Sequence, residues 1–310
     1  MNHYVIGIDI GGTNIKIGLV DKKGLVRARG HLSTKDFIHS KTKLIEAIVL
    51  GCQDILKKYG IKKSQVSGIG IGLPGLVNTK KSLVYSLTNI PGWKNVPLKK
   101  IIEKEIKIPT FIDNDVNVMT LAEWKYGAGR GMKNMVCITI GTGLGGGLVI
   151  NNQLYRGEGF AAGELGHIPI NEKGQKCNCG GWGCLETYAG NRYLNVRAKN
   201  IFHKKITLEE ITCKASLGEK KAIVFWKEVA EHIGNGLTGV VNVLNPSCIV
   251  IGGGIAKAHQ HMFQIIRLTI KKRAMHVQGK MVRIVKSRLG SDAGIIGTRV
   301  LVKEMLGKNG

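Results

Sequence analysis

The chain has 310 residues, of which 43% are apolar and 22% charged, so it can bury a substantial core and is not disordered throughout. Its 46 Lys and Arg against 21 Asp and Glu give a formal net charge of +25. That charge is spread along the chain, with no basic run longer than Lys271–Arg273, which disfavours a specific nucleic-acid partner and favours a solvated basic surface that would also attract a polyanion such as ATP.

The first half begins with two strand-like segments, Tyr4–Ile10 and Ile15–Val20, which predict a β-hairpin. Its turn, Gly11-Gly12-Thr13-Asn14, holds more glycine than chain reversal requires. Farther along, periodicity predicts helices over 41–58, about 98–105 and 116–126, and strands over 67–72 and 109–112.

The second half repeats this arrangement, because strands over 135–140 and 147–150 are joined by the glycine-rich loop 141–146. Two such units about 130 residues apart predict an internally duplicated α/β architecture of two domains, with one glycine loop on each half facing a cleft. We expect a small domain of 1–116 plus about 295–310 and a larger one of 117–294. The remaining predicted elements are helices over 220–243, 261–275 and 291–305 and strands over 248–251 and 281–285.

The glycine loops carry the residue types that bind a magnesium–nucleotide complex. Backbone N–H groups and a lysine neutralise phosphoryl oxygens, while an aspartate holds Mg²⁺, usually through water. One such loop is equally well explained as a tight turn, but a second loop and a third cluster at Gly252–Gly254 favour ATP binding. The predicted nucleotide-binding residues are Asp9, Gly11, Gly12, Thr13, Asn14, Lys16, Gly141, Thr142, Gly143, Gly145, Gly253 and Gly254.

A cysteine-rich loop predicts a structural zinc site. Cys177, Cys179 and Cys184 lie within eight residues, and His167 can complete a tetrahedral Cys₃His set. His167 by itself would more often be a hydrogen-bonded structural histidine, so its assignment depends on the cysteines. Seven cysteines arranged in this way indicate a metal cluster in a reducing compartment, and with no signal peptide or membrane span we expect a cytoplasmic protein.

Carboxylates near the two predicted ligand loops are candidates for chemistry. Asp115 stands between a strand and a helix, where an aspartate is most often a helix cap but can also be the base of phosphoryl transfer. Glu164 and Glu186 bracket the cysteine loop; they are either solvated or paired for a polyhydroxyl ligand. Trp93, close to Asn89, is either a wall of that pocket or part of the core.

These motifs together resemble the ROK family of repressors and sugar kinases, and within it the bacterial glucokinases. The resemblance covers the chain nearly end to end. It rests on Asp9–Lys16, Gly72–Gly75, Asn114–Asn117, Gly141–Gly143, Gly163–His167, Cys177–Glu186, Ala122–Gly129 and Gly290–Gly294.

The resemblance implies an actin-like, ribonuclease-H-like fold of two domains, a homodimer, and ATP and a hexose as substrates, with glucose the leading one. It makes Asp115 the base that takes the proton of the sugar 6-hydroxyl. His167 would be both a zinc ligand and a sugar contact. The implied substrate-binding residues are Gly75, Asn89, Asn114, Asp115, Glu164, His167 and Glu186.

The sequence departs from the glucokinase pattern at two positions, and it leaves other functions open. Asp113 and Val116 stand where the glucokinases commonly have Glu and Ala. Kinases for N-acetylmannosamine, allose or fructose use nearly the same residues. A sugar-responsive repressor would carry an N-terminal helix-turn-helix, for which a hairpin starting at Tyr4 leaves no room. A chaperone-type actin-like ATPase would not need the paired glutamates or the zinc loop.

Overall fold

The computed structural model describes residues 3–37, 40–87, 93–258 and 261–308. The chain folds into two compact units, each with its own apolar core. The first comprises Met1–Arg130, Arg156–Ala162 and Leu289–Gly310, and the second comprises Gly131–Tyr155 and Gly163–Arg288. These units divide the chain at other positions than the predicted domains, because the helices over 115–125 and 293–308 pack on each other in the first unit.

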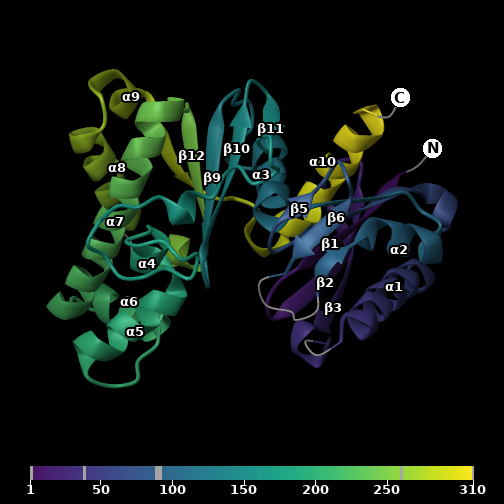
Figure 1. The fold of residues 1–310 in the computed structure, drawn as a ribbon, viewed down its shortest axis with the longest axis horizontal. Helices are drawn as coiled ribbons and strands as arrows, with labels where there is room; N and C mark the ends of the chain where they lie inside the picture. Colours follow the sequence, from purple (N-terminus) through teal and green to yellow (C-terminus); the bar gives the residue numbers. More distant parts are fainter. Residues whose placement is uncertain (1–2, 38–39, 88–92, 259–260, 309–310) are drawn as a thin grey trace. The chain divides into compact units, whose positions relative to one another are not determined.

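The first unit contains a five-stranded sheet of order β3-β2-β1-β4-β8 (Figure 1). β1 and β2 form the predicted hairpin, with Gly7 opposite Gly18, and β4 and β8 continue the sheet in parallel. A smaller sheet, β5-β6-β7, belongs to the same unit. The strands are β1 (Tyr4–Ile10), β2 (Asn14–Asp21), β3 (Val26–Ser33), β4 (Val66–Leu73), β5 (Val77–Asn78), β6 (Leu83–Ser86), β7 (Lys94–Val96) and β8 (Thr110–Asn114).

Helices cover both faces of this sheet. α10 (Ala293–Lys308) packs on β1, β2 and β4, and neighbouring glycines of these strands allow the approach: a Cβ at Gly7 or Gly70 would collide with Thr298. α1 (Lys41–Lys58) packs on β2 and β3 through its predicted apolar stripe, which is buried. The unit also contains α2 (Leu98–Ile106) and α3 (Asp115–Lys125).

The second unit contains a sheet of order β11-β10-β9-β12-β13, with the same succession of antiparallel and parallel pairings as the first (Figure 1). The predicted internal duplication is therefore confirmed at the level of sheet topology. The strands are β9 (Met135–Ile140), β10 (Leu144–Ile150), β11 (Gln153–Tyr155), β12 (Cys248–Gly253) and β13 (Arg283–Lys286).

Helices of the second unit surround a core that includes Phe225, Trp226 and Ile233 of α7. The predicted helices over 220–243 and 261–275 are confirmed, and a separate short helix, α9, follows the latter. None of the described helices combines the length and apolar character needed to cross a bilayer. The helices are α4 (Glu186–Ala189), α5 (Asn191–Phe202), α6 (Leu208–Ser216), α7 (Lys220–Leu244), α8 (Met262–Arg273) and α9 (His276–Met281).

Candidate functional site

The junction of β8 and α3 carries the predicted catalytic residue. Asn114, the last residue of β8, accepts hydrogen bonds at its Oδ1 from the N–H groups of Val116 (2.9 Å) and Asn117 (3.2 Å). Asn114 is therefore the N-cap of α3, and the Oδ1 of Asp115 also accepts a hydrogen bond from the N–H of Val116, at 2.9 Å. Asp115 is the first residue of α3 and is partly exposed, where the helix dipole stabilises a negative charge.

Gly75 and Asn114, both predicted sugar contacts, lie together in the first unit. The Nδ2 of Asn114 donates to the carbonyl oxygen of Gly75 at 3.1 Å. Gly75 has φ 106°, and a Cβ there would clash with the carbonyl of Ser86, so only glycine fits. The Oδ1 of Asn114 thus caps α3 while its Nδ2 holds the Gly75 carbonyl, so this one side chain ties the start of the helix to the Gly75 turn.

Two further residues were candidates for the sugar pocket in the sequence, Trp93 and Asn89. Trp93 is only 3% exposed and belongs to the core of the first unit, which confirms the core alternative for it. Asn89 lies outside the described residues. Asp113, 1% exposed, holds Arg156 in an ion pair in which the guanidinium Nε and Nη2 reach Oδ2 at 2.8 and 2.6 Å.

Asp9 and Lys16 face each other beside the first glycine loop, with 3.8 Å between Oδ2 and Nζ. Burial raises the pKa of Asp9, and the charge of Lys16 opposes that rise. Lys16 also donates to the carbonyl of Ser291 at 2.7 Å, and a Cβ on Gly294 would collide with the Asp9 carboxylate. The segment Gly290–Gly294 therefore helps to build this loop, although the sequence indicated it only as a point of resemblance.

The backbone of the first loop is arranged to offer N–H groups. The side chain of Thr34 donates to the carbonyl of Gly11 at 2.8 Å, and its N–H donates to the carbonyl of Thr13 at 2.9 Å. Within the described part of the chain, the N–H groups of Gly12 and Thr13 donate to no protein acceptor. Two unpaired amides next to a lysine and a carboxylate suit a phosphate with a metal ion.

The second glycine loop has the same character but is shorter than predicted. β10 begins at Leu144, so only Gly141–Gly143 form the turn, and the prediction of a loop through Gly146 is wrong. Gly145 and Gly146 lie in the strand, and a Cβ on Gly146 would clash with the 163–165 segment, which explains the glycine at that position. The N–H of Asn191 donates to the carbonyl of Gly141 at 2.8 Å and braces the turn.

The structure brings the third glycine cluster to the second loop. β12 runs parallel to β9, so Gly253 pairs with Ile140, directly before Gly141. Gly253 has φ 83°, and a Cβ there would clash with the Ile140 carbonyl, whereas one on Gly254 would meet open space. Gly141–Gly143 and Gly253–Gly254 thus form one glycine-lined edge of the second unit's sheet.

Glu186 lies at the same turn. Its Oε2 accepts a hydrogen bond from the N–H of Leu144 at 2.8 Å, and the position of a Cβ on Gly143 would be 2.5 Å from that oxygen. Glu164 lies elsewhere in the unit, with its Oε2 3.9 Å from the Nε2 of His167. The structure therefore places each predicted sugar carboxylate next to a different predicted ligand group.

The four predicted metal ligands gather in one place. The ligand atoms of His167, Cys177, Cys179 and Cys184 all lie within 4.8 Å of one another. The Nδ1 of His167 is 3.7 Å from the Sγ of Cys177, and the sulfurs of Cys179 and Cys184 are 3.6 Å apart. Ligand bonds of about 2.3 Å for sulfur and 2.0 Å for nitrogen around a tetrahedral Zn²⁺ require separations of about 3.5–3.8 Å. The two separations of 3.7 and 3.6 Å match this range, so the four residues could hold a metal ion.

The environment of these thiols also suits a metal. Burial raises the pKa of Cys184 to about 12, whereas a hydrogen bond from the Gly181 backbone lowers the pKa of Cys179. Without a metal Cys184 therefore keeps its proton, and a metal ion that binds here must displace the thiol protons while His167 binds as the neutral imidazole. With Nδ1 on the metal side, the Nε2–H of His167 points toward Glu164, which would fix the ring tautomer.

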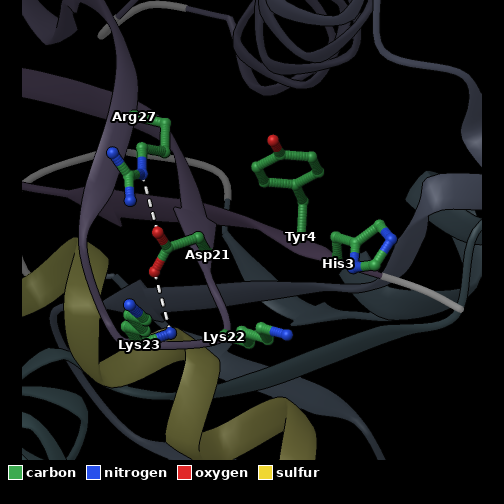
Figure 2. A pocket seen from close by; sticks show the side chains of 6 residues that line it. All are labelled: His3, Tyr4, Asp21, Lys22, Lys23 and Arg27. Atoms are coloured by element: carbon green, nitrogen blue, oxygen red, sulfur yellow. Dashed lines mark hydrogen bonds and ion pairs between the residues drawn. The ribbon is translucent and has the colours of Figure 1, made fainter.

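A hollow of about 380 Å³ in the first unit is unrelated to these residues. Figure 2 shows its lining, in which Asp21 accepts a bond from the Nε of Arg27 at 2.6 Å and another from the N–H of Lys23. The remaining lining residues are His3, Tyr4 and Lys22. None of the predicted site residues contributes to it.

Sequence reasoning missed Arg156 as part of the site. It is one of only six basic residues in the stretch 111–190, against seven acidic ones, and no motif singles it out. The sequence holds no signal that would have identified it, because its partner Asp113 is 43 residues away.

Comparison with known proteins agrees with this arrangement. The sequence matches the ROK family over residues 5–305. It is 34% identical to a glucokinase of Halalkalibacterium halodurans, over 98% of this chain and 96% of that protein. It is 30% identical to a xylose repressor of Bacillus spizizenii, over 97% of this chain and 77% of the repressor.

A solved structure is similar in fold. The ROK family glucokinase of Streptomyces griseus, determined in complex with glucose and AMPPNP, superposes with a TM-score of 0.83 at 30% identity, covering 97% of this chain and 99% of that one. The mixed α/β architecture with duplicated sheets is thus the actin-like ATPase fold. With the family match spanning nearly the whole sequence, the chain belongs to the ROK family.

Proposed function

We propose that this protein is an ATP-dependent sugar kinase that phosphorylates the 6-hydroxyl of a hexose, with glucose as the substrate. The observation that carries the proposal is the position of Asp115 at the first residue of α3, where Asn114 has taken over the capping role. A partly exposed carboxylate held there, with its Oδ1 bonded to the N–H of Val116, has the chemistry of a general base. Relatives named glucokinase and a relative solved with glucose and AMPPNP support the substrate pair.

Each group has a role in the proposed reaction. Asp115 takes the proton of the 6-hydroxyl as that oxygen attacks the γ-phosphorus, and the bond to the ADP oxygen breaks. Mg²⁺, when bound, neutralises charge on the phosphates, and Asp9 would hold it through water. The glycine turns would bind phosphates through their amides, and Gly253 and Gly254 would lie at the adenosine side. Hydroxyls of the sugar ring would bind to Gly75, Asn89, Asn114, Glu164, His167 and Glu186.

We also propose that the Cys₃His cluster holds one structural Zn²⁺. Four protein ligands leave no coordination position for a substrate water, so the ion would have no catalytic step. It would fix the loop that connects the segments carrying Glu164 and Glu186, by tying His167 to three sulfurs downstream. A cytoplasmic homodimer is the expected form of the protein, which light scattering coupled to size exclusion would test.

A sugar-responsive regulator is the second candidate, because the chain aligns with xylose repressors almost as extensively as with glucokinases. The two candidates differ in turnover. A regulator would bind a sugar without releasing ADP, whereas a kinase releases one ADP for each sugar phosphate formed.

The test is a panel of sugars with MgATP, following ADP release. Glucose, mannose, fructose, allose, N-acetylmannosamine and xylose form the panel, and the largest kcat/KM is expected for glucose. Asp115→Asn should reduce kcat by about 10²–10⁴ while sugar binding, measured by calorimetry, changes little. Absence of sugar-dependent ADP release from the native protein, or an Asp115→Asn variant within a few-fold of it, would refute the proposal.

A further inference from the structure

The short segment Arg156–Ala162 is an excursion of the chain into the first unit. The residues on either side of it, Tyr155 and Gly163, belong to the second unit. The excursion is closed on itself, since the N–H of Ala162 donates to the carbonyl of Arg156 at 3.0 Å. Glu164, a proposed sugar contact, follows it after one residue, Gly163. The contact that holds this segment in the first unit therefore also fixes the stretch of chain that leads to the proposed sugar-binding residues.

The anchor is the side chain of Arg156. Both Nε and Nη2 donate to a single carboxylate oxygen, Oδ2 of Asp113, at 2.8 and 2.6 Å. The side chains are only 12% and 2% exposed, so water does little to screen the pair. A guanidinium that donates through two of its nitrogens is held in orientation as well as in distance, which a lysine would not achieve.

The other oxygen of the same carboxylate holds the catalytic junction. Oδ1 of Asp113 accepts from the N–H of Asn114 at 2.8 Å and from the Nδ2 of Asn117 at 3.0 Å. These two residues flank Asp115 in the sequence. One buried carboxylate thus connects Arg156 to the backbone on one side of Asp115 and to a side chain on the other.

A purely structural role does not account well for this arrangement. Buried ion pairs contribute little net stability compared with apolar residues of similar size, because the charges must be desolvated. What such a pair does supply is a defined geometry. Here the geometry concerns Asn114, directly before the proposed base, and Asn117, two residues after it.

We propose that Arg156 is a positioning residue for phosphoryl transfer. Through Asp113 it fixes the β8–α3 junction in the orientation that presents Asp115 to the sugar hydroxyl. Because Arg156 belongs to the segment that leads into Glu164, this orientation depends on where that segment lies. This inference rests on the proposed kinase function. It assigns Arg156 no contact with substrate.

The experiment compares Arg156→Gln, Arg156→Lys and the double variant Arg156→Gln/Asp113→Asn with the native protein. For each, kcat, KM for sugar, KM for ATP and the midpoint of thermal unfolding are measured. Arg156→Gln should lower kcat at least tenfold and raise KM for sugar, with KM for ATP changed less than twofold. Arg156→Lys, which keeps the positive charge but cannot donate through two nitrogens of one planar group, should give an intermediate kcat.

The double variant separates positioning from stability. Arg156→Gln leaves a buried carboxylate without its cation, so its unfolding midpoint should fall; adding Asp113→Asn removes that charge and should restore the midpoint while kcat stays low. Arg27→Gln is the matched control, because it breaks an ion pair of the same 2.6 Å length in the same unit, away from the site (Figure 2). Its kinetic constants should equal those of the native protein.

Two results would overturn the inference while leaving the kinase proposal intact. One is an Arg156→Gln variant whose kcat stays within twofold of an active native protein. The other is a double variant that regains kcat together with its unfolding midpoint, as a purely structural pair would. If Arg156→Gln fails to fold, the double variant and Arg156→Lys decide the question. A native protein without sugar-dependent turnover would instead refute the proposed function, and this inference with it.

Discussion

Glu186 accepts a hydrogen bond from the N–H of Leu144 at 2.8 Å, 42 residues away in the sequence. This bond joins a carboxylate proposed to contact the sugar to the turn proposed to contact a phosphate, within one compact unit. The close fit at Gly143 means that the turn can keep this arrangement only without a side chain at that position. In the second unit, the proposed sugar-binding carboxylate and the proposed phosphate-binding turn therefore hold each other in place.

Gly143→Ala tests this coupling. The new methyl group would lie 2.5 Å from the Glu186 Oε2, and the flexible carboxylate should move away before the fold does. We expect a fall in kcat/KM for sugar of about tenfold or more, since a displaced hydrogen-bond partner costs about 1–3 kcal/mol. Gly239→Ala, where a Cβ meets nothing within 4 Å, is the control and should leave the kinetics unchanged. Equal kinetics in both variants would contradict the coupling.

Removal of the metal should destabilise the second unit. Elemental analysis should find one zinc per chain, and a strong chelator should lower the unfolding midpoint by several degrees, because metal affinity contributes directly to folding. Cys184→Ala should do the same without chelator. Cys213→Ala, at an exposed free cysteine outside the cluster, should retain both zinc and stability. A metal-free protein with the native unfolding midpoint would show that the cluster binds no structural ion.

Glu123 should stabilise two connections of the chain. It is 1% exposed, and its two oxygens accept hydrogen bonds from the N–H groups of Ala128 (2.8 Å) and Leu289 (2.9 Å), next to the points where the chain leaves and re-enters the first unit. Glu123→Gln replaces one acceptor with a donor, so one N–H loses its partner. Urea unfolding should show a loss of about 1–3 kcal/mol.

The exposed Glu105 on α2 provides the comparison for this variant. Glu105→Gln changes the same atoms without removing a buried acceptor, and its free energy of unfolding should stay within about 0.5 kcal/mol of the native value. If the two substitutions cost the same, the bonds of Glu123 do not stabilise the connections.

The pH dependence of stability should reveal the burial of Asp9. Because burial raises its pKa in the folded state, the stability contributed by this group is complete below its unfolded pKa of about 3.9 and is lost as the pH rises through the folded pKa. Asp9→Asn removes that loss. The free energy of unfolding of Asp9→Asn relative to the native protein should therefore increase from about pH 4 towards neutrality.

Urea unfolding at several pH values measures this difference, with the exposed Asp54→Asn as the matched variant. In the native protein the affinity for magnesium–nucleotide should rise with pH while stability falls, since a cation favours the ionised carboxylate that higher pH provides. If the free energies of unfolding of Asp9→Asn and the native protein differ by the same amount at every pH, burial does not raise the pKa of Asp9.

Elements with strong local patterns could be predicted from the sequence. α1 and α7 each bury an apolar stripe, β1 and β2 are buried along most of their length, and the predicted limits of all four agree with the structure within a few residues. β3 and α5 were not predicted, because each buries few side chains: only Ala28 in β3, and Leu194 and Ala198 in α5. A segment that buries so little leaves hardly any periodicity in its sequence.

The sequence by itself determined the groups whose members are close along the chain. The cysteine cluster spans eight residues, and each glycine turn follows directly from its own strand, so spacing alone placed the ligands together. Only the tertiary structure decided which distant residues complete them: Arg156 for Asp113, Ser291 for Lys16 and Leu144 for Glu186. These pairs depend on the pairing of strands and the packing of helices over 42 to 275 residues of chain, which local propensity does not encode.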